Sequence, residues 1–146
     1  MPPSSRIIAH HRASMFREMG SINEAQAAAL ETTSVPILRD WLARAQYFGW
    51  VVEGDDQVIA GGGIIIRHLL PRPECLQGGE EAYILNLYTE PPDRRQGVAR
   101  QLMEAIIAWC HERRCARVTL HPSEAGQPLY ASLGFERTKE MRLQQE

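Results

Sequence analysis

The chain has 146 residues, of which 44% are hydrophobic and 23% charged, and its formal net charge is −2. This composition is ordinary for a globular domain and excludes a disordered, collagen-like or disulfide-scaffold chain. The charge gives no general attraction to nucleic acid or anionic membranes, and the three cysteines lack metal-ligand spacing. We therefore expect one domain over residues 1–146 and a cytoplasmic protein with no metal, no nucleic-acid partner and no membrane partner.

Capping residues and apolar spacing predict three helices in the first third of the chain, over about residues 4–19, 21–31 and 34–48. Ser4 or Ser5 would cap the first. The capping box Ser21–Glu24 would open the second, and the third would restart beside Pro36. On the first helix, His10 and His11 are expected to be solvated or lightly packed.

The middle of the chain predicts strands. Residues 50–53 and 58–66 flank the turn 54–56, which favours a hairpin. The run Gly61-Gly62-Gly63 inside the second strand indicates a bulge or a close approach of backbones. Residues 82–89 predict a central strand, because this run is apolar and rich in β-formers.

The remaining chain predicts a helix over 98–113, a short strand over 117–121, a helix over 123–133 and a last strand over 135–143. The order is three helices, three strands, helix, strand, helix, strand. This order indicates a mixed α/β or α+β fold.

The stretch from Asn86 to Arg100 carries the chemistry. A strand ends at Glu90-Pro91-Pro92-Asp93, and a basic turn containing Gly97 then opens a long helix. A helix start presents unpaired N–H groups and suits a phosphate or pyrophosphate. Gly97 lets the backbone approach the anion, and Ala99 allows close packing. The alternative is that the arginines of this turn are surface side chains only.

A second motif follows in Leu129-Tyr130-Ala131-Ser132-Leu133-Gly134-Phe135. Together with Arg94-Arg95-Gln96-Gly97-Val98-Ala99, it resembles the GNAT superfamily of acetyl-CoA-dependent N-acetyltransferases. The first stretch matches the Gln/Arg-x-x-Gly-x-Gly/Ala signature after the fourth strand, and the second matches the signature that ends the last helix. The resemblance covers residues 83–143. It implies a mostly antiparallel central sheet flanked by helices, with strands four and five splayed to hold CoA.

The resemblance also implies the roles of individual residues. The backbone N–H groups from Gln96 to Arg100 would hold the pyrophosphate, and backbone groups of the fourth strand would pair with the pantetheine arm. A strand N–H would polarise the thioester carbonyl. The cofactor-binding set is then Leu87, Tyr88, Thr89, Arg94, Arg95, Gln96, Gly97, Val98, Ala99, Arg100 and Ser123.

Two residues are candidates for the catalytic machinery. Tyr130 matches the tyrosine that protonates the departing CoA thiolate, and its alternative role is a core tyrosine packed on the sheet. Asn86 cannot take a proton but could orient a water or the amine. No single general base stands out among the candidates, which are Glu81, Tyr83, Asn86, Glu90 and His121.

The sequence departs from the family pattern in two places. The family usually begins with a strand, whereas this chain is expected to open in a helix, so the sheet edge would be exposed or covered by a partner in a homodimer. Ser123 stands where the family often has an asparagine that contacts pantetheine, and its hydroxyl could instead cap the helix.

The expected activity is transfer of acetyl from acetyl-CoA, as co-substrate, to a primary amine of a small molecule or peptide by direct attack in a ternary complex. The alternative is a non-catalytic acyl-CoA-binding sensor or interaction module on the same fold. The acceptor is not readable from the sequence.

Overall fold

The computed structural model describes residues 3–145. The helices are α1 (Ser5–Glu18), α2 (Glu24–Ala43), α3 (Val98–Arg113) and α4 (Gln127–Ser132), with a short 3-10 turn at Pro91–Asp93. The strands are β1 (Tyr47–Gly54), β2 (Gln57–Leu69), β3 (Gly79–Thr89) and β4 (Arg117–Leu120). No helix within residues 3–145 is long and apolar enough to span a bilayer.

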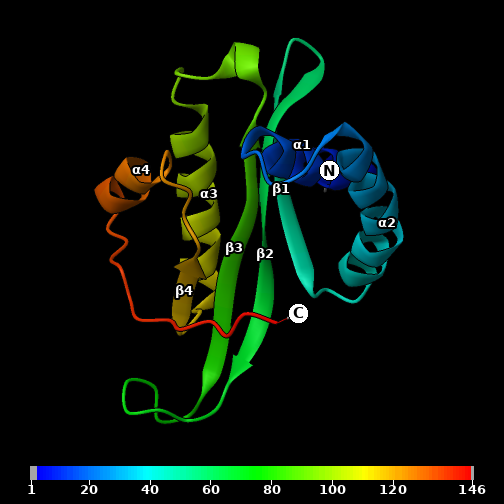
Figure 1. Cartoon of the computed structure of the whole chain (residues 1–146). Helices are drawn as coiled ribbons and strands as arrows, with labels where there is room; N and C mark the ends of the chain where they lie inside the picture. Colours follow the sequence, from blue (N-terminus) through cyan, green and yellow to red (C-terminus); the bar gives the residue numbers. More distant parts are fainter. Residues whose placement is uncertain (1–2, 146) are drawn as a thin grey trace.

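The four strands form one sheet in the order β1-β2-β3-β4. The first three strands are antiparallel, and β4 runs parallel to β3. Figure 1 shows α1 and α2 grouped beside β1 and β2, and α3 and α4 grouped beside β4. The alpha+beta class and the mostly antiparallel sheet predicted from the sequence are confirmed.

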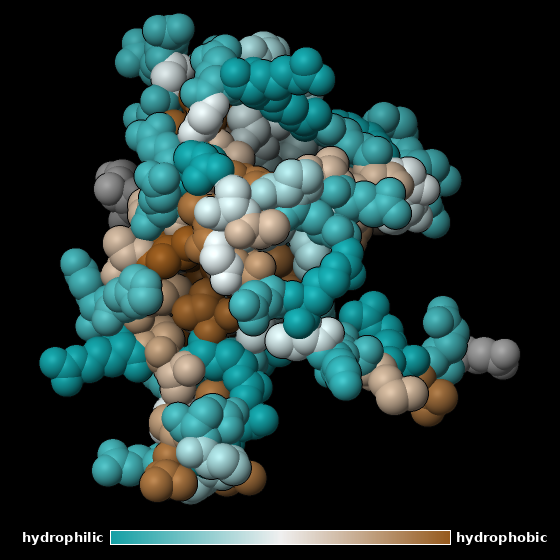
Figure 2. Space-filling view, turned by 90° about the vertical axis from the view of Figure 1, so that its left-hand side faces the viewer, coloured by the Kyte–Doolittle hydropathy of each residue, from teal (hydrophilic) through white to brown (hydrophobic). Residues whose placement is uncertain are grey.

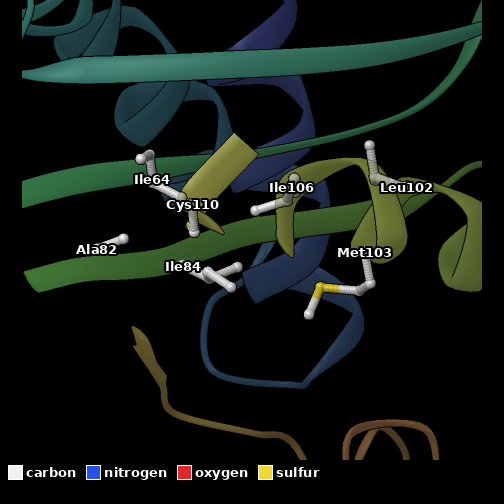
Figure 3. Close-up of a cluster of buried hydrophobic side chains, with 7 residues drawn as sticks. All are labelled: Ile64, Ala82, Ile84, Leu102, Met103, Ile106 and Cys110. Carbon is white, nitrogen blue, oxygen red and sulfur yellow. The ribbon is translucent and has the colours of Figure 1, made fainter. Parts of the chain in front are cut away.

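Two apolar clusters hold the helices on opposite faces of the sheet. On the face covered by α3, residues of β2, β3 and α3 pack together, as Figure 3 shows for Ile64, Ala82, Ile84, Leu102, Met103, Ile106 and Cys110. On the face covered by α1 and α2, the buried residues are Ile8, Ala9, Leu38 and Tyr47. We call these two surfaces the α3 face and the α1 face.

Two details of the helical region differ from the sequence prediction. The second and third predicted helices are one continuous helix, α2, with Pro36 inside it. Pro36 removes only one backbone hydrogen bond, and the burial of Ala27 and Leu38 against the rest of the molecule outweighs this loss. The capping box is Asn23–Gln26 rather than Ser21–Glu24.

The three consecutive glycines in β2 lie at close approaches and opposite a bulge. A Cβ atom at Gly61 would meet the ring of His11, and one at Gly62 would meet Leu87. Across from them, β3 carries one extra residue, because Gly61 pairs with Tyr88 while Gly63 pairs with Leu85. The predicted bulge is therefore present but lies in the partner strand β3, and the close approach to the glycines is made mainly by side chains rather than by backbones.

The predicted last strand over residues 135–143 is wrong. In the described residues no strand follows β4, and residues 136–145 are exposed without regular structure. Five consecutive polar residues, 136–140, interrupt the alternation of apolar side chains, so this segment has no apolar face to bury. It runs back past β4 and across the view toward β2 (Figure 1).

The first described element is the helix α1, as expected, but the expected solvation of His11 is wrong. His11 is only 2% exposed, and its ring lies 5.5 Å from that of Tyr88. Burial, followed by the charge of His10, lowers the pKa of His11 to about 4. The ring is therefore neutral when it holds α1 against the sheet.

This burial predicts a pH dependence of stability. The pKa of His11 is lower in the folded than in the unfolded protein, so protonation of His11 favours unfolding. The free energy of unfolding is therefore unaffected by this group above pH 6.5 and decreases as the pH falls from 6.5 toward 4. The full decrease is about 3 kcal/mol. Urea unfolding is expected to give a free energy about 2 kcal/mol lower at pH 5 than at pH 7. The variant His11→Gln should remove most of this difference, whereas His111→Gln, at an exposed position, should keep it. A difference that survives His11→Gln would contradict the assignment.

Candidate functional site

The site begins where β3 and β4 part. Their parallel pairing runs from Glu81 beside Arg117 to Ile84 beside Leu120 and then stops. We call the end of this pairing the fork. Beyond it, residues 85–89 of β3 have no strand partner on the β4 side among the described residues. A bulge bends the strand that carries it, and the extra residue of β3 lies just past the fork. The pairing thus stops where β4 itself ends, and β3 continues beyond it with a free edge; the splaying implied by the family resemblance stays a prediction.

The basic turn after β3 leads into a helix start with free amides. Within residues 3–145, none of the backbone N–H groups of residues 96–100 donates a hydrogen bond. We call these five groups the amide cradle. Gly97 is the N-cap residue of α3, has a φ of 78°, and has open space where a Cβ atom would stand. This conformation favours glycine and leaves the amides accessible to an anion.

The three arginines of this turn differ in their partners. Arg94 is already bound, because it donates to Glu18 (2.6 Å) and to the carbonyl of Thr89 (2.8 Å). Arg100 donates to the neutral hydroxyl of Ser132 at 2.6 Å. Among the described residues, neither Arg95 nor Arg100 has a carboxylate within ion-pair distance. Their uncompensated charge is suited to phosphate oxygens.

Glu18, at the end of α1, holds the basic turn through two hydrogen bonds. It accepts hydrogen bonds from Tyr88 and from Arg94, both at 2.6 Å. Burial by itself would raise the pKa of Glu18, but these two hydrogen bonds and the charge of Arg94 outweigh it and hold the pKa below its usual value. The carboxylate therefore ties the end of α1 to the start of the basic turn.

The cofactor-binding residues predicted on β3 point in different directions. The side chain of Leu87 lies on the α3 face, near Gly62. Tyr88 is buried on the α1 face, where burial and the hydrogen bond to Glu18 raise its pKa to about 12. Because the Tyr88 side chain is buried there, it cannot contact a ligand at the fork. Only the backbone of Tyr88 borders the fork.

Tyr130 lies on α4, against the α3-face cluster. Its ring packs edge-on to Phe135 at 6.2 Å, and burial raises its pKa. Its hydroxyl has no hydrogen-bond partner among the described residues and is not fully enclosed. A Cβ atom at Gly126 would lie 2.7 Å from the ring. The absence of a side chain at Gly126 therefore leaves the room that the Tyr130 ring occupies. Tyr130 is thus packed like a core residue while its hydroxyl is free.

Two further features border the fork on this side. Ser123 precedes α4, which begins at Gln127 rather than at residue 123, and its hydroxyl accepts from the N–H of Gly126 at 3.2 Å. Figure 2 shows apolar surface gathered in the middle of the face that carries α3, α4 and β4, with polar side chains around it. An apolar surface of this kind suits an uncharged chain such as pantetheine.

Asn86 occupies the bulge with a φ of 60° and is 3% exposed. The bulge turns its side chain to the α1 face, where its amide donates to the Tyr47 hydroxyl at 3.0 Å and its carbonyl accepts from Arg12 at 2.8 Å. Asparagine tolerates this left-handed backbone better than most residues. The side chain is therefore engaged in holding the bulge and α1 together.

Two of the predicted base candidates have basic side chains as partners. Glu81 is buried and lies 3.4 Å from Arg67 and 3.7 Å from Arg117. Glu90 lies 3.1 Å from His10.

The remaining two base candidates meet each other. The Tyr83 hydroxyl lies 2.8 Å from Nδ1 of His121, and Nε2 of His121 lies 3.0 Å from Glu140. Sequence reasoning missed Glu140, because nothing local in the tail indicates that it returns to β4.

The chain matches the model of the acetyltransferase (GNAT) family over residues 12–135. Among solved structures, it is similar to a GCN5-related N-acetyltransferase from Ralstonia eutropha JMP134, with 35% sequence identity and a TM-score of 0.88. That match covers 99% of this chain and 95% of the other. A search of curated proteins by sequence gave no match.

Two more distant structures share the fold. A predicted acetyltransferase from Clostridium acetobutylicum, solved with acetyl-CoA, is 23% identical with a TM-score of 0.84, and the match covers 97% of this chain and 89% of that one. A glucosamine-6-phosphate N-acetyltransferase from Arabidopsis thaliana is 15% identical with a TM-score of 0.63, over 95% of this chain and 92% of that one.

Proposed function

Because the chain belongs to the acetyltransferase (GNAT) family, we propose that it moves acetyl from acetyl-CoA to a primary amine by direct attack in a ternary complex. N-acetyl transfer is the activity of the family, and acetyl-CoA is its usual co-substrate. The observation that carries the proposal is the amide cradle: five free N–H groups at a helix start, immediately beyond a fork in the sheet.

Each part of acetyl-CoA has a suitable partner in this arrangement. The pyrophosphate would accept from the amide cradle, with the charges of Arg95 and Arg100 beside it. The pantetheine arm would lie along the free edge of β3 near Leu87 and Thr89, as an added strand. The Clostridium acetobutylicum protein, which shares the fold, was solved with acetyl-CoA, and this supports acetyl-CoA as the co-substrate.

The thioester would then lie at the fork, where the Tyr130 hydroxyl can protonate the departing CoA thiolate. The amine nitrogen attacks the carbonyl carbon, the C–S bond breaks, and the sulfur takes the electron pair and the proton of the Tyr130 hydroxyl. A buried phenol remains protonated at neutral pH, so this hydroxyl is available as a donor. Asn86 supports the step as a positioning residue, since it holds the bulge that shapes the fork.

The proposal is tested by comparing the amount of CoA thiol released with the amount of amine acetylated. Incubation with acetyl-CoA and a panel of primary amines (spermidine, glucosamine and a lysine-containing peptide) is expected to release one CoA thiol per acetylated amine. Thiol is followed by a colorimetric reagent and the acetylated amine by mass spectrometry. Tight CoA binding by calorimetry without turnover on any amine would contradict catalysis and favour an acyl-CoA sensor.

A further inference from the structure

A hydrogen-bonded chain of three side chains crosses the α1 face beside the fork. It joins Tyr83 of β3, His121 just after β4 and Glu140 of the C-terminal tail, with links of 2.8 and 3.0 Å. The rings of Tyr83 and His121 also meet edge-on at 5.2 Å. Tyr83 and His121 are 38 positions apart in the sequence, and His121 and Glu140 are 19 positions apart. Only the tertiary structure brings these three side chains together.

The sheet register explains why these groups meet. Tyr83 lies beside Thr119 in the parallel pair, so their side chains share a face. His121 is two residues beyond Thr119 and returns to that face. It is also the first residue after β4, so the pair stands at the point where the strands part. Tyr83 also pairs with Ile65 of β2, which packs in the α1-face cluster, whereas Tyr130 packs in the α3-face cluster.

The hydrogen bonds indicate which nitrogen of His121 carries the proton. A carboxylate can only accept, so Nε2 beside Glu140 is the protonated nitrogen. In the neutral imidazole with this tautomer, Nδ1 is an acceptor and takes its bond from the Tyr83 hydroxyl. The carboxylate orients the imidazole, and the imidazole in turn is ready to take a proton from the phenol.

We infer that Tyr83, His121 and Glu140 form the proton relay that deprotonates the attacking amine. This inference rests on the proposed function. As the N–C bond forms, the proton lost by the amine passes to the Tyr83 oxygen while the Tyr83 proton passes to Nδ1 of His121. The imidazolium is stabilised by Glu140 and later loses its proton to water. On the opposite face, Tyr130 protonates the departing sulfur and is reprotonated by water.

The surroundings favour this direction of transfer. The Arg67 guanidinium lies 4.3 Å from the centre of the Tyr83 ring and can stabilise negative charge on the phenol oxygen as the proton moves. Glu81, beside Arg67 and Arg117, is held in ion pairs and does not compete as base. The side chain of His121 is 48% exposed, so water can reach it to remove the proton.

Steady-state kinetics with acetyl-CoA and the best amine of the panel test the relay. Tyr83→Phe and His121→Gln are each expected to lower kcat about 100-fold, because each removes general-base assistance. Glutamine keeps an acceptor but cannot take the proton. His111→Gln, on the exposed side of α3, is the matched control and should keep full kcat. CoA affinity by calorimetry should be unchanged in all three variants, since none touches the amide cradle.

A second measurement does not depend on turnover. The ¹⁵N shifts of the His121 ring should report the Nε2-protonated tautomer in the wild type, and Glu140→Ala should reduce that preference. Glu136→Ala, in the same exposed tail, should leave it unchanged. Protonated Nδ1 in the wild type, or unchanged kcat in Tyr83→Phe and His121→Gln, would overturn the relay. Failure of the wild type to acetylate any amine would instead count against the proposed function.

Discussion

Replacement of Gly97 by alanine is expected to weaken acetyl-CoA binding about 100-fold. Gly97 has a φ of 78° at the N-cap of α3, where an alanine is strained. Because Gly97 is one of the five residues of the amide cradle, we also expect the added methyl group to hinder the approach of the pyrophosphate. Loss of two charge-assisted hydrogen bonds, at about 1.5 kcal/mol each, accounts for a change of this size. Calorimetric titration with CoA measures it.

Gly20 is the matched control for this substitution. It has a φ of 76°, and nothing lies within 4 Å of a Cβ atom built on it, so Gly20→Ala introduces the same backbone strain away from the cradle. Both variants should lose about 1 kcal/mol of unfolding free energy. Only Gly97→Ala should lose CoA affinity. Equal CoA affinities in the two variants would mean that the cradle does not hold the phosphates.

Removal of the Tyr130 hydroxyl is the second large effect. Tyr130→Phe is expected to lower kcat about 100-fold, which is the usual contribution of a positioned general acid. The Kd for CoA should hardly change, because the phenol ring and its packing on Phe135 are kept. Initial rates at saturating acetyl-CoA, together with calorimetry, separate the two quantities.

The packing of Tyr130 makes this test sharp. Its hydroxyl bonds to no other described residue, so removing it should change the unfolding free energy by less than about 0.5 kcal/mol. A variant that folds normally, binds CoA and turns over at the wild-type rate would remove Tyr130 from the mechanism. In that case Tyr130 would be a core residue that only packs against the α3-face cluster.

The conformation of the basic turn at the start of α3 could be predicted because its causes are local. A strand, a proline break, a glycine and an amphipathic helix follow one another within about twenty residues, and each acts through its own backbone preferences. The same holds for the N-cap at Ser4, whose hydroxyl accepts from the N–H of Ile7. The free edge of β3 beyond Leu120 and the extra residue opposite the glycine run of β2 came only from the structure.

Predictions that depended on distant partners were less reliable. The segment 34–36 was expected to start a new helix after a break near Glu31, yet packing of α2 keeps one helix intact. The tail after Phe135 was expected to form a strand, but a strand requires an edge to pair with and an apolar face to bury. His11 was expected near solvent, because its burial depends on how closely α1 approaches the glycines of β2.

The amino-acid order alone thus determined the family, the α+β class and the glycine-capped start of α3, since these depend on local motifs and on backbone conformations set within a few residues. Tertiary structure decided the directions of the polar side chains. The bulge turned Asn86 to the α1 face, ion pairs engaged Glu81 and Arg94, and the returning tail brought Glu140 to His121. These outcomes depend on strand register and on contacts between residues far apart in the chain, which no local pattern encodes.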